Sequence, residues 1–497
     1  MKMVKSLILG SAAGILAMSG AQAADLPVKA KAVEYVRICS LYGAGFYYMP
    51  GTDTCIKFGG YLRADTAIAG GDYGFMYSSG TTNRGSNNRL GNYWDARARM
   101  DLTIDTRTAT EYGVVRTFAD MVFSVDSATV SASAPSAIAG GTAGLGLYHA
   151  FIQFAGFTFG RTISAFDTPW TGYPAGGPDT IPGGSNMVTG VDQVTYTAQF
   201  GNGVSASISA QDQTTAGNGQ SNLWNITAAN AATFIQGTYG SNDWGGTRSP
   251  DIIGQLRVDQ AWGLFQLSAV AHDLHAAYYG ATEPTGHPGD KWGWAVQAAL
   301  SIKNVPTGPG DSINMQAVYA DGATHYTFGN ISWPQNFSMY SGSGIGAYQS
   351  VGFAGLADGV FAAGLGIESV KTWGFRGGYT HNWNPNWASA IYGGYAGLRY
   401  GDTGKALICA NFATLGPSAG ATCNPDFNVA VIGVNTVWTP VKNLAFTADV
   451  HWLHLDQKYS GTISANTGVA AFAKPVAVYE LKDQNSVAAL LRAQRNF

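Results

Sequence analysis

The feature that most constrains this chain is strict alternation of apolar and polar side chains, and residues 94–105 show it most clearly. Their sequence is WDARARMDLTID. A β-strand places alternate side chains on opposite faces, so this segment is predicted to be a strand with two unlike faces. The charged face carries Asp95, Arg97, Arg99, Asp101 and Asp105. The apolar face carries Trp94, Ala96, Ala98, Met100, Leu102 and Ile104.

Composition separates the classes of protein that such strands can build. The chain has 497 residues, of which only 12% are charged and 12% are aromatic, with 66 glycines. Its mean hydropathy is −0.00, and no apolar run reaches the roughly 18 residues of a transmembrane helix. Near-neutral hydropathy with abundant Gly and aromatic residues is typical of a membrane β-barrel, in which half of each strand is polar.

The lengths of the connections between predicted strands alternate between long and short. This alternation is expected of an outer-membrane barrel, which has long external loops and short periplasmic turns. A segment at 232–239 also looks like a strand, but including it would place a two-residue connection on the external side, so we assign it to a loop. The sequence then predicts a 16-stranded antiparallel transmembrane β-barrel. The predicted strands are 56–65, 94–105, 112–123, 147–155, 157–163, 191–200, 204–211, 252–261, 264–274, 291–302, 312–324, 372–382, 387–400, 427–438, 444–456 and 485–497.

Two further patterns agree with a membrane barrel. Four tryptophans flank the predicted short turns, where an interfacial aromatic girdle belongs; they are Trp262, Trp383, Trp387 and Trp438. The last predicted strand ends in Phe497, with Val487, Ala489, Leu491 and Ala493 on the same face. A terminal Phe on an amphipathic strand resembles the outer-membrane assembly signal, although Arg495 interrupts this face.

The N-terminus predicts export. Lys2 and Lys5 precede an apolar stretch, and Ala21-Gln22-Ala23 forms an A-x-A cleavage site, so residues 1–23 are expected to be a cleaved signal peptide. Cleavage removes two lysines and no acidic residue, so the number of basic residues falls from 28 to 26, against 31 acidic residues. This mildly acidic balance argues against nucleic acid as a partner.

Four cysteines remain in the mature chain, in two local pairs. Disulfides Cys39–Cys55 and Cys409–Cys423 are the simple pairing among three possible ones, and an exported protein permits them. A metal site is the alternative, but no CxxC spacing is present and no histidine lies near in the sequence. Residues 24–55 are then an N-terminal periplasmic segment with a disulfide, and residues 56–497 are the barrel.

Three stretches carry a family resemblance. The runs CSLYGAGFYYMPGTDTCIKFGGYLRAD (39–65), AFIQFAGFTFGRTISAFD (150–167) and LRAQRNF (491–497) resemble the alphaproteobacterial general porin family, and with the strand count the resemblance covers essentially the whole mature chain. It implies a homotrimer in the outer-membrane lipid, with a water-filled channel for small hydrophilic solutes and ions. It also implies that the third external loop, residues 164–190, folds inward as a constriction.

Charged residues suggest how such a constriction would select solutes. The loop 164–190 contains acids but no Lys or Arg, and arginines on the first three strands are expected to face it across the lumen. Acids opposite a basic ladder create a transverse field that orients polar solutes; the simpler interpretation is that these charges are solvated lining. The candidate residues are Arg63, Arg97, Arg99, Arg116, Arg161, Asp167 and Asp179.

Small outward-facing residues on the first five strands are compatible with a contact between barrels, although a Gly- and Ala-rich chain also presents them by chance. They are Gly60, Ala64, Ala96, Ala98, Ala119 and Ala150.

Signals for catalysis are poor. His272 and His275 are three apart on a predicted strand and so face opposite sides, as do His451 and His454, and neither pair can chelate a metal within its strand. No nucleophile-elbow, P-loop or dinucleotide motif is present. We therefore expect no enzyme, cofactor or metal, but a general diffusion porin. The alternatives are a substrate-specific channel, for example for sugars, and a surface-binding protein anchored by its barrel.

Overall fold

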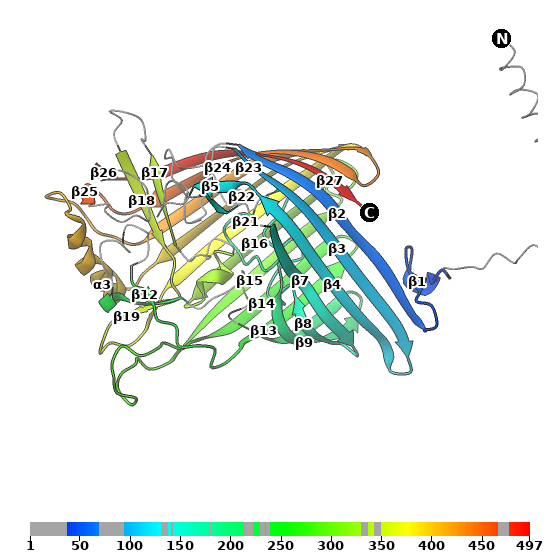
Figure 1. Cartoon of the computed structure of the whole chain (residues 1–497), viewed down its shortest axis with the longest axis horizontal. Coiled ribbons are helices and arrows are strands. Elements are labelled where there is room, and N and C mark those ends of the chain that lie inside the picture. Colours follow the sequence, from blue (N-terminus) through cyan, green and yellow to red (C-terminus); the bar gives the residue numbers. More distant parts are fainter. Residues whose placement is uncertain are drawn as a thin grey trace, which may run out of the picture.

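The computed structural model describes residues 37–68, 94–130, 138–140, 143–178, 180–212, 214, 222–228, 234, 239–329, 336–341, 349–465 and 477–497. Sixteen antiparallel strands form a closed barrel (Figure 1), because each pairs with the next and β27 pairs with β2. They are β2 (Thr54–Ile68), β3 (Trp94–Thr110), β4 (Gly113–Asp126), β7 (Ala143–Phe154), β8 (Phe157–Thr162), β9 (Val191–Gly201), β10 (Val204–Gln211), β13 (Asp251–Gln260), β14 (Gly263–Leu274), β15 (Lys291–Lys303), β16 (Ser312–Asp321), β21 (Lys371–Asn384), β22 (Trp387–Arg399), β23 (Phe427–Val441), β24 (Leu444–Gln457) and β27 (Gln484–Asn496).

This barrel confirms the predicted strand count and the exclusion of residues 232–239. Strand β10 pairs directly with β13, from Val204↔Val258 to Gln211↔Asp251, so no other strand lies between them. All sixteen predicted segments coincide with barrel strands. The ends differ by a few residues; the first predicted strand, 56–65, is β2 at Thr54–Ile68.

The short connections all lie at one end of the barrel, and their residues suit tight turns. Asn202 and Gly203 both have positive φ, 49° and 75°, which is the backbone of a two-residue hairpin that follows the twist of its strands. Trp387 and Trp438 stack at this end with ring centroids 5.8 Å apart. The predicted girdle tryptophans are all among the exposed side chains of the barrel.

The two faces of the strands differ as the alternation predicts. In β3, Trp94 is 60% exposed and Met100 39%, whereas Asp95 and Asp101 are 3% and 6% exposed. The apolar side chains therefore point away from the barrel and the charged ones into its lumen. No helix among the described residues has the length and apolar character of a membrane span.

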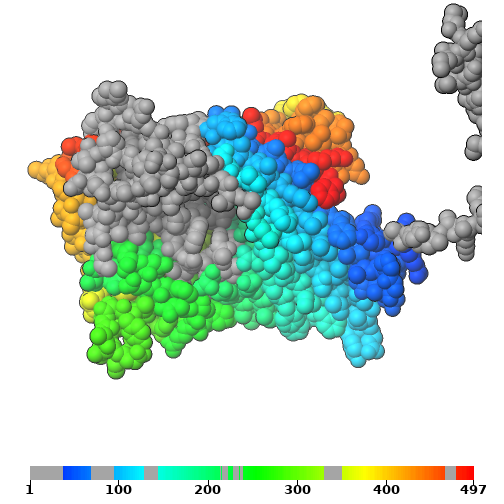
Figure 2. Space-filling view, viewed as in Figure 1, coloured from blue at the N-terminus to red at the C-terminus, as the bar shows by residue number. Residues whose placement is uncertain are grey.

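The N-terminal segment is fastened at the short-turn end, beside β2. It contains η2 (Ser40–Tyr42) and β1 (Tyr47–Tyr48), which pairs with β2, and it stands out from the barrel wall in Figures 1 and 2. The Cys39–Cys55 disulfide is confirmed and is buried with Phe46. Arg107 of β3 lies 4.9 Å from the centroid of the Phe46 ring, so the segment rests on the lumen-facing side chains of the wall.

The long loops build a second layer of structure at the other end (Figure 1). Side chains of these loops pack against inward-facing side chains of the barrel in one hydrophobic cluster, which includes the buried aromatic residues Trp224, Phe353 and Tyr459. The Cys409–Cys423 disulfide is confirmed here. The smaller elements are β5 (Ala128–Val130), β6 (Ile138–Gly140), β11 (Leu223–Asn225), η3 (Ile226–Ala228), β12 (Ser241–Asn242), η4 (Thr324–Tyr326), β17 (Asn336–Ser341), β18 (Gln349–Gly355), β19 (Gly359–Phe361), β20 (Glu368–Ser369), α3 (Asp402–Phe412), η5 (Ala413–Leu415), β25 (Thr462–Ala465) and β26 (Ala477–Leu481).

Removing the first disulfide with Cys39→Ala and Cys55→Ala is expected to release the N-terminal segment without opening the barrel. The bridge closes a loop with a sequence separation of 16, worth about 3 kcal/mol in chain entropy, whereas barrel closure rests on β2–β27 pairing. Proteinase K digestion with mass spectrometry should then cut beyond residue 40 while heat-modifiable migration persists. Cys409→Ala with Cys423→Ala is the control; equal protection of the segment in both variants would contradict the prediction.

Candidate pore constriction

The loop between β8 and β9, residues 164–190, lies inside the barrel along its inner wall. Amide side chains on successive strands donate hydrogen bonds to its backbone carbonyls. Gln255 of β13 donates to Ala165 O at 2.7 Å. Gln266 of β14 donates to Asp167 O at 2.9 Å, and Gln297 of β15 donates to Phe166 O at 2.8 Å. The first turn of the loop is thus held by three neighbouring strands.

The same arrangement continues around the barrel. Gln316 of β16 accepts a hydrogen bond of 2.8 Å from the Trp170 indole. Asn314 donates to Pro174 O at 2.7 Å. On the far side, Arg492 of β27 donates to Pro178 O at 3.5 Å. The loop therefore crosses the lumen from β13 to β27 and replaces water at the polar lining of those strands.

Arg376 of β21 is the strongest of these anchors. Its side chain is 1% exposed, and its guanidinium donates to four loop carbonyls, those of Thr171, Ile181, Gly184 and Ser185. A guanidinium has five N–H donors in a fixed fork, which suits a cage of carbonyl oxygens. Each hydrogen bond to a charged group contributes about 1.5–3 kcal/mol, so this residue dominates the seating of the loop.

Two glycines let the loop lie flat against the wall next to Arg376. A Cβ atom at Gly183 would lie 2.3 Å from Phe375 O, and one at Gly184 would lie 2.2 Å from the Gln316 amide nitrogen. Gly183 also has a φ of +99°, which L side chains rarely adopt. Only glycine permits this close approach of loop and strand backbones.

The wall formed by β2 and β3 carries a pair of arginines. Arg63 and Arg99 are direct cross-strand neighbours. Arg63 Nε donates to Gln494 Oε1 at 2.8 Å and Arg99 Nε donates to Ser124 Oγ at 2.9 Å. Both acceptors are neutral, and the hydrogen bonds orient the two guanidinium groups. The carboxylate of Asp65 interacts with Arg63, and that of Asp101 interacts with both arginines.

Two more arginines flank this pair, each with an acid. Arg97 forms a bidentate ion pair with Asp126 of β4. Arg492 forms an ion pair of 2.7 Å with Asp65 of β2. Arg492 therefore touches both the basic wall and the loop, and marks where the loop closes toward that wall.

Arg116 and Arg161 lie apart from the Arg63–Arg99 pair. Arg116 is eight positions from Ser124 on β4, about 26 Å along a strand, and its guanidinium contacts Asp105 at 3.0 Å near the short-turn end. Arg161 Nε donates to Thr189 O at 3.1 Å and so holds the end of the loop. The expected single ladder of arginines is thus split into separate groups.

Asp167, the loop acid that the structure describes, does not face the channel as expected. Asp167 is 4% exposed, and its carboxylate accepts a hydrogen bond of 2.6 Å from the Met187 backbone N–H. Burial raises the pKa of this carboxyl. Asp167 therefore joins the two ends of the loop instead of facing the channel. Asp179 lies outside the described residues.

Sequence reasoning missed Arg376 and Arg492, although a signal for both was present. Each occupies an inward position of its strand, because alternate residues point inward and the apolar neighbours Phe375 and Leu491 are exposed. The same alternation marks the amides at Gln266, Gln297 and Gln316. Long hydrogen-bond donors at inward positions of several neighbouring strands indicate a wall that binds a loop, because a wall lined only by water does not need them.

Comparison with known proteins gives the family. A family model described as "Porin subfamily" matches residues 25–490. The chain belongs to this porin subfamily. Porin Omp2b of Brucella suis biovar 1 (strain 1330) is 32% identical over 370 residues, covering 66% of this chain and 88% of that protein. Porin Omp2b of Brucella canis is 31% identical with the same coverage.

Solved structures agree with the barrel. The outer membrane channel DcaP of Acinetobacter baumannii is similar with a TM-score of 0.57 and 17% sequence identity, covering 90% of this chain and 99% of that one. Porin membership places the chain in the bacterial outer membrane and in a family of channels rather than enzymes. The resemblance read from the sequence is thus confirmed.

Arg376→Gln is expected to loosen the loop and to produce larger, noisier single-channel currents, because the loop loses most of its four charged hydrogen bonds. Planar-bilayer recording of purified protein measures both properties. Arg399→Gln is the matched control, because Arg399 lies on the neighbouring strand β22 and donates hydrogen bonds to Phe427 O and Asn428 Oδ1, at 2.9 and 2.7 Å, outside the loop. Unchanged conductance and noise in Arg376→Gln would show that Arg376 does not set the opening.

Proposed function

We propose that this porin is a passive, water-filled general diffusion channel for small hydrophilic solutes and ions, narrowed between loop 164–190 and the wall of β2 and β3. The observation that carries the proposal is the attachment of the loop to side chains on the far wall, which leaves the Arg63–Arg99 pair facing the remaining passage. A sixteen-stranded barrel is wide enough for an aqueous lumen, and the inward loop reduces it to a size that selects solutes.

The electrostatics of this passage favour anions. Two like charges on facing cross-strand positions are unfavourable for folding, and at the narrow point they create a positive field in a low-dielectric wall. Asp65 and Asp126 offset the charges of Arg492 and Arg97. We expect Arg63 and Arg99 to be the main source of positive potential, because the two arginines share one interacting acid, Asp101.

Bilayer recording of the purified protein tests the channel itself. Stepwise conductance that scales with bulk salt conductivity is expected of a water-filled passage. Folded, heat-modifiable protein that gives no steps would contradict a channel and would favour the alternative of a barrel-anchored binding surface.

Arg63→Gln with Arg99→Gln is expected to shift the reversal potential in a KCl gradient toward cation preference, because the fixed positive charge at the narrowest point is lost. The matched control is Arg107→Gln with Arg116→Gln, which removes the same charge from the lumen near the short-turn end, where both arginines contact Asp105. If the control pair shifts the potential equally, selectivity arises from total lumen charge and not from the proposed constriction.

We also propose a homotrimer in which β2 and β3 contribute to the contact between barrels. Ala64 and Ala98 are exposed on the outer face and line a groove of about 610 Å³ together with Met100 and Phe123. Ala64 also borders a second groove of about 490 Å³ that contains Trp438. Small side chains between larger ones let a second barrel approach closely.

Ala64→Trp is expected to weaken this trimer, because the indole fills the space that a neighbouring barrel would enter. Light scattering coupled to size-exclusion chromatography should show a mass falling from three chains toward one. Ala269→Trp places the same ring on the exposed outer face of β14 and should leave the trimer intact. An unchanged mass for Ala64→Trp would exclude this face as the contact.

A further inference from the structure

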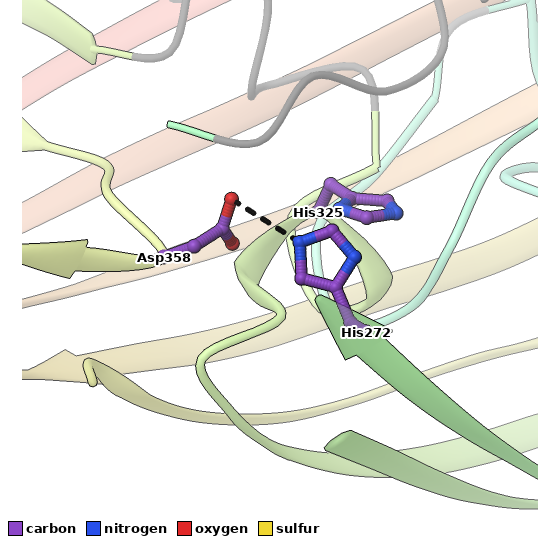
Figure 3. A group of neighbouring side chains, drawn as sticks. All are labelled: His272, His325 and Asp358. Atoms are coloured by element: carbon purple, nitrogen blue, oxygen red, sulfur yellow. Dashed lines mark ion pairs between the residues drawn. The ribbon is translucent and has the colours of Figure 1, made fainter. Parts of the chain in front are cut away.

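Three buried side chains from separate segments meet near the long-loop end of the barrel (Figure 3). His272 lies near the end of β14, His325 is in η4, and Asp358 lies between β18 and β19. They are 0%, 3% and 1% exposed. One ring nitrogen of each histidine and one carboxylate oxygen of Asp358 lie within 4.8 Å of one another. No two of the three are close in sequence, so the fold alone assembles the cluster.

Neighbouring groups aim His272 and Asp358 at the same point. Asp251 Oδ1 lies 2.7 Å from His272 Nδ1 and fixes the ring so that Nε2 points toward Asp358 Oδ2, 3.9 Å away. A metal ion between Nε2 and this oxygen would take the place of the Nε2 proton. This carboxylate–histidine arrangement is typical of histidines that bind metals. Asp358 Oδ1 in turn accepts hydrogen bonds from Thr324 N and Oγ1, at 2.6 and 2.8 Å.

The cluster has a buried ring nitrogen without a hydrogen-bond partner in the described part of the chain, and it contains two buried carboxylates. Nδ1 of His325 is buried and has no hydrogen-bond partner among the residues that the structure describes, which is costly for a polar atom. Asp251 and Asp358 bring two buried carboxylates, and in the described part of the chain both lie beside His272, at 2.7 Å from Nδ1 and 3.9 Å from Nε2. A metal ion bound at His272 would supply the positive charge that buried carboxylates need, in place of a protonated imidazole.

We propose that His272, His325 and Asp358 bind a divalent transition-metal ion of the Zn²⁺ class. Two imidazole nitrogens and one carboxylate oxygen form a common ligand set for Zn²⁺, with water as the fourth ligand. Tetrahedral ligand atoms lie about 3.4 Å apart, so binding requires atoms that now span up to 4.8 Å to approach by up to about 1.4 Å. Side-chain rotation of His325, which has no hydrogen bond from Nδ1 to break, supplies this movement.

The site is connected to the constriction loop. Tyr326, next to His325, donates a hydrogen bond of 2.6 Å to Asp251 and packs on Phe166 of the loop with ring centroids 4.5 Å apart. Gly183 N and Gly184 N donate to Thr327 O at 3.0 and 2.9 Å. A metal that fixes η4 therefore also steadies the loop at both places.

The test uses the full-length folded protein, stripped with EDTA and titrated with Co²⁺ as a spectroscopic probe. Tetrahedral visible absorption bands saturating at one ion per chain are expected, and Zn²⁺ should displace Co²⁺ and raise the thermal unfolding temperature. His325→Gln should abolish both effects. It is preferred to a His272 variant, which would also disrupt the buried contact with Asp251.

His275→Gln is the control variant, because His275 lies three residues from His272 but contacts the separate carboxylate of Asp290 at 2.7 Å. It should keep the Co²⁺ bands. The proposal is overturned if folded wild-type protein binds no Co²⁺ or Zn²⁺, or if His325→Gln binds as wild type does. Metal content and thermal unfolding decide the site whether or not the barrel conducts, so failure of the proposed channel would be seen separately.

Discussion

Every feature of this porin depends on one constraint: backbone N–H and C=O groups facing lipid must be satisfied within the protein. A sheet meets that demand only if it has no edge, so β27 must pair with β2. Closure of an antiparallel sheet requires an even number of strands. It therefore puts the start of β2 and the end of β27 on the same side of the membrane. It also leaves half of the strand side chains pointing into a wide lumen, where their chemistry is free to serve other purposes.

The barrel was predictable because its signals are local. Alternation needs only neighbouring residues, as in residues 94–105, and the alternation of loop lengths excludes wrong strands such as residues 232–239 through closure alone. The disulfides were predictable for the same reason, since Cys39–Cys55 and Cys409–Cys423 each join positions close in sequence. The physical rules that act within a strand, or across one turn, are visible in a single sequence.

The constriction was less predictable because it depends on contacts between distant segments. Arg99 and Arg116 both point inward, but they lie far apart along the strands. Arg99 pairs with Ser124 of β4, which is eight positions from Arg116. Asp167 was expected to face the lumen, yet a loop backbone turns its carboxylate to Met187 N. The histidines show the same limit. His272 and His275 have different partners, as their opposite faces predict. The sequence gives no sign that His325 approaches His272 from another loop. Period-two patterns give the face of a residue, not its neighbours.

The side of the lumen wall that binds the loop differs in its hydrogen bonding from the side formed by β2 and β3. Side chains such as Gln266 and Arg376 exchange their hydrogen bonds with water for hydrogen bonds with the loop, so this wall gains structure. Arg63 and Arg99 instead donate hydrogen bonds to neighbouring strands, and as cross-strand neighbours of like charge they repel each other. Backbone pairing across β2 and β3 extends from Thr54↔Thr108 to Ile68↔Trp94, and it holds the strands in register regardless of that repulsion. Closure thus allows an unfavourable side-chain pair to be kept on the lumen wall, where we propose that its charge acts on passing solutes.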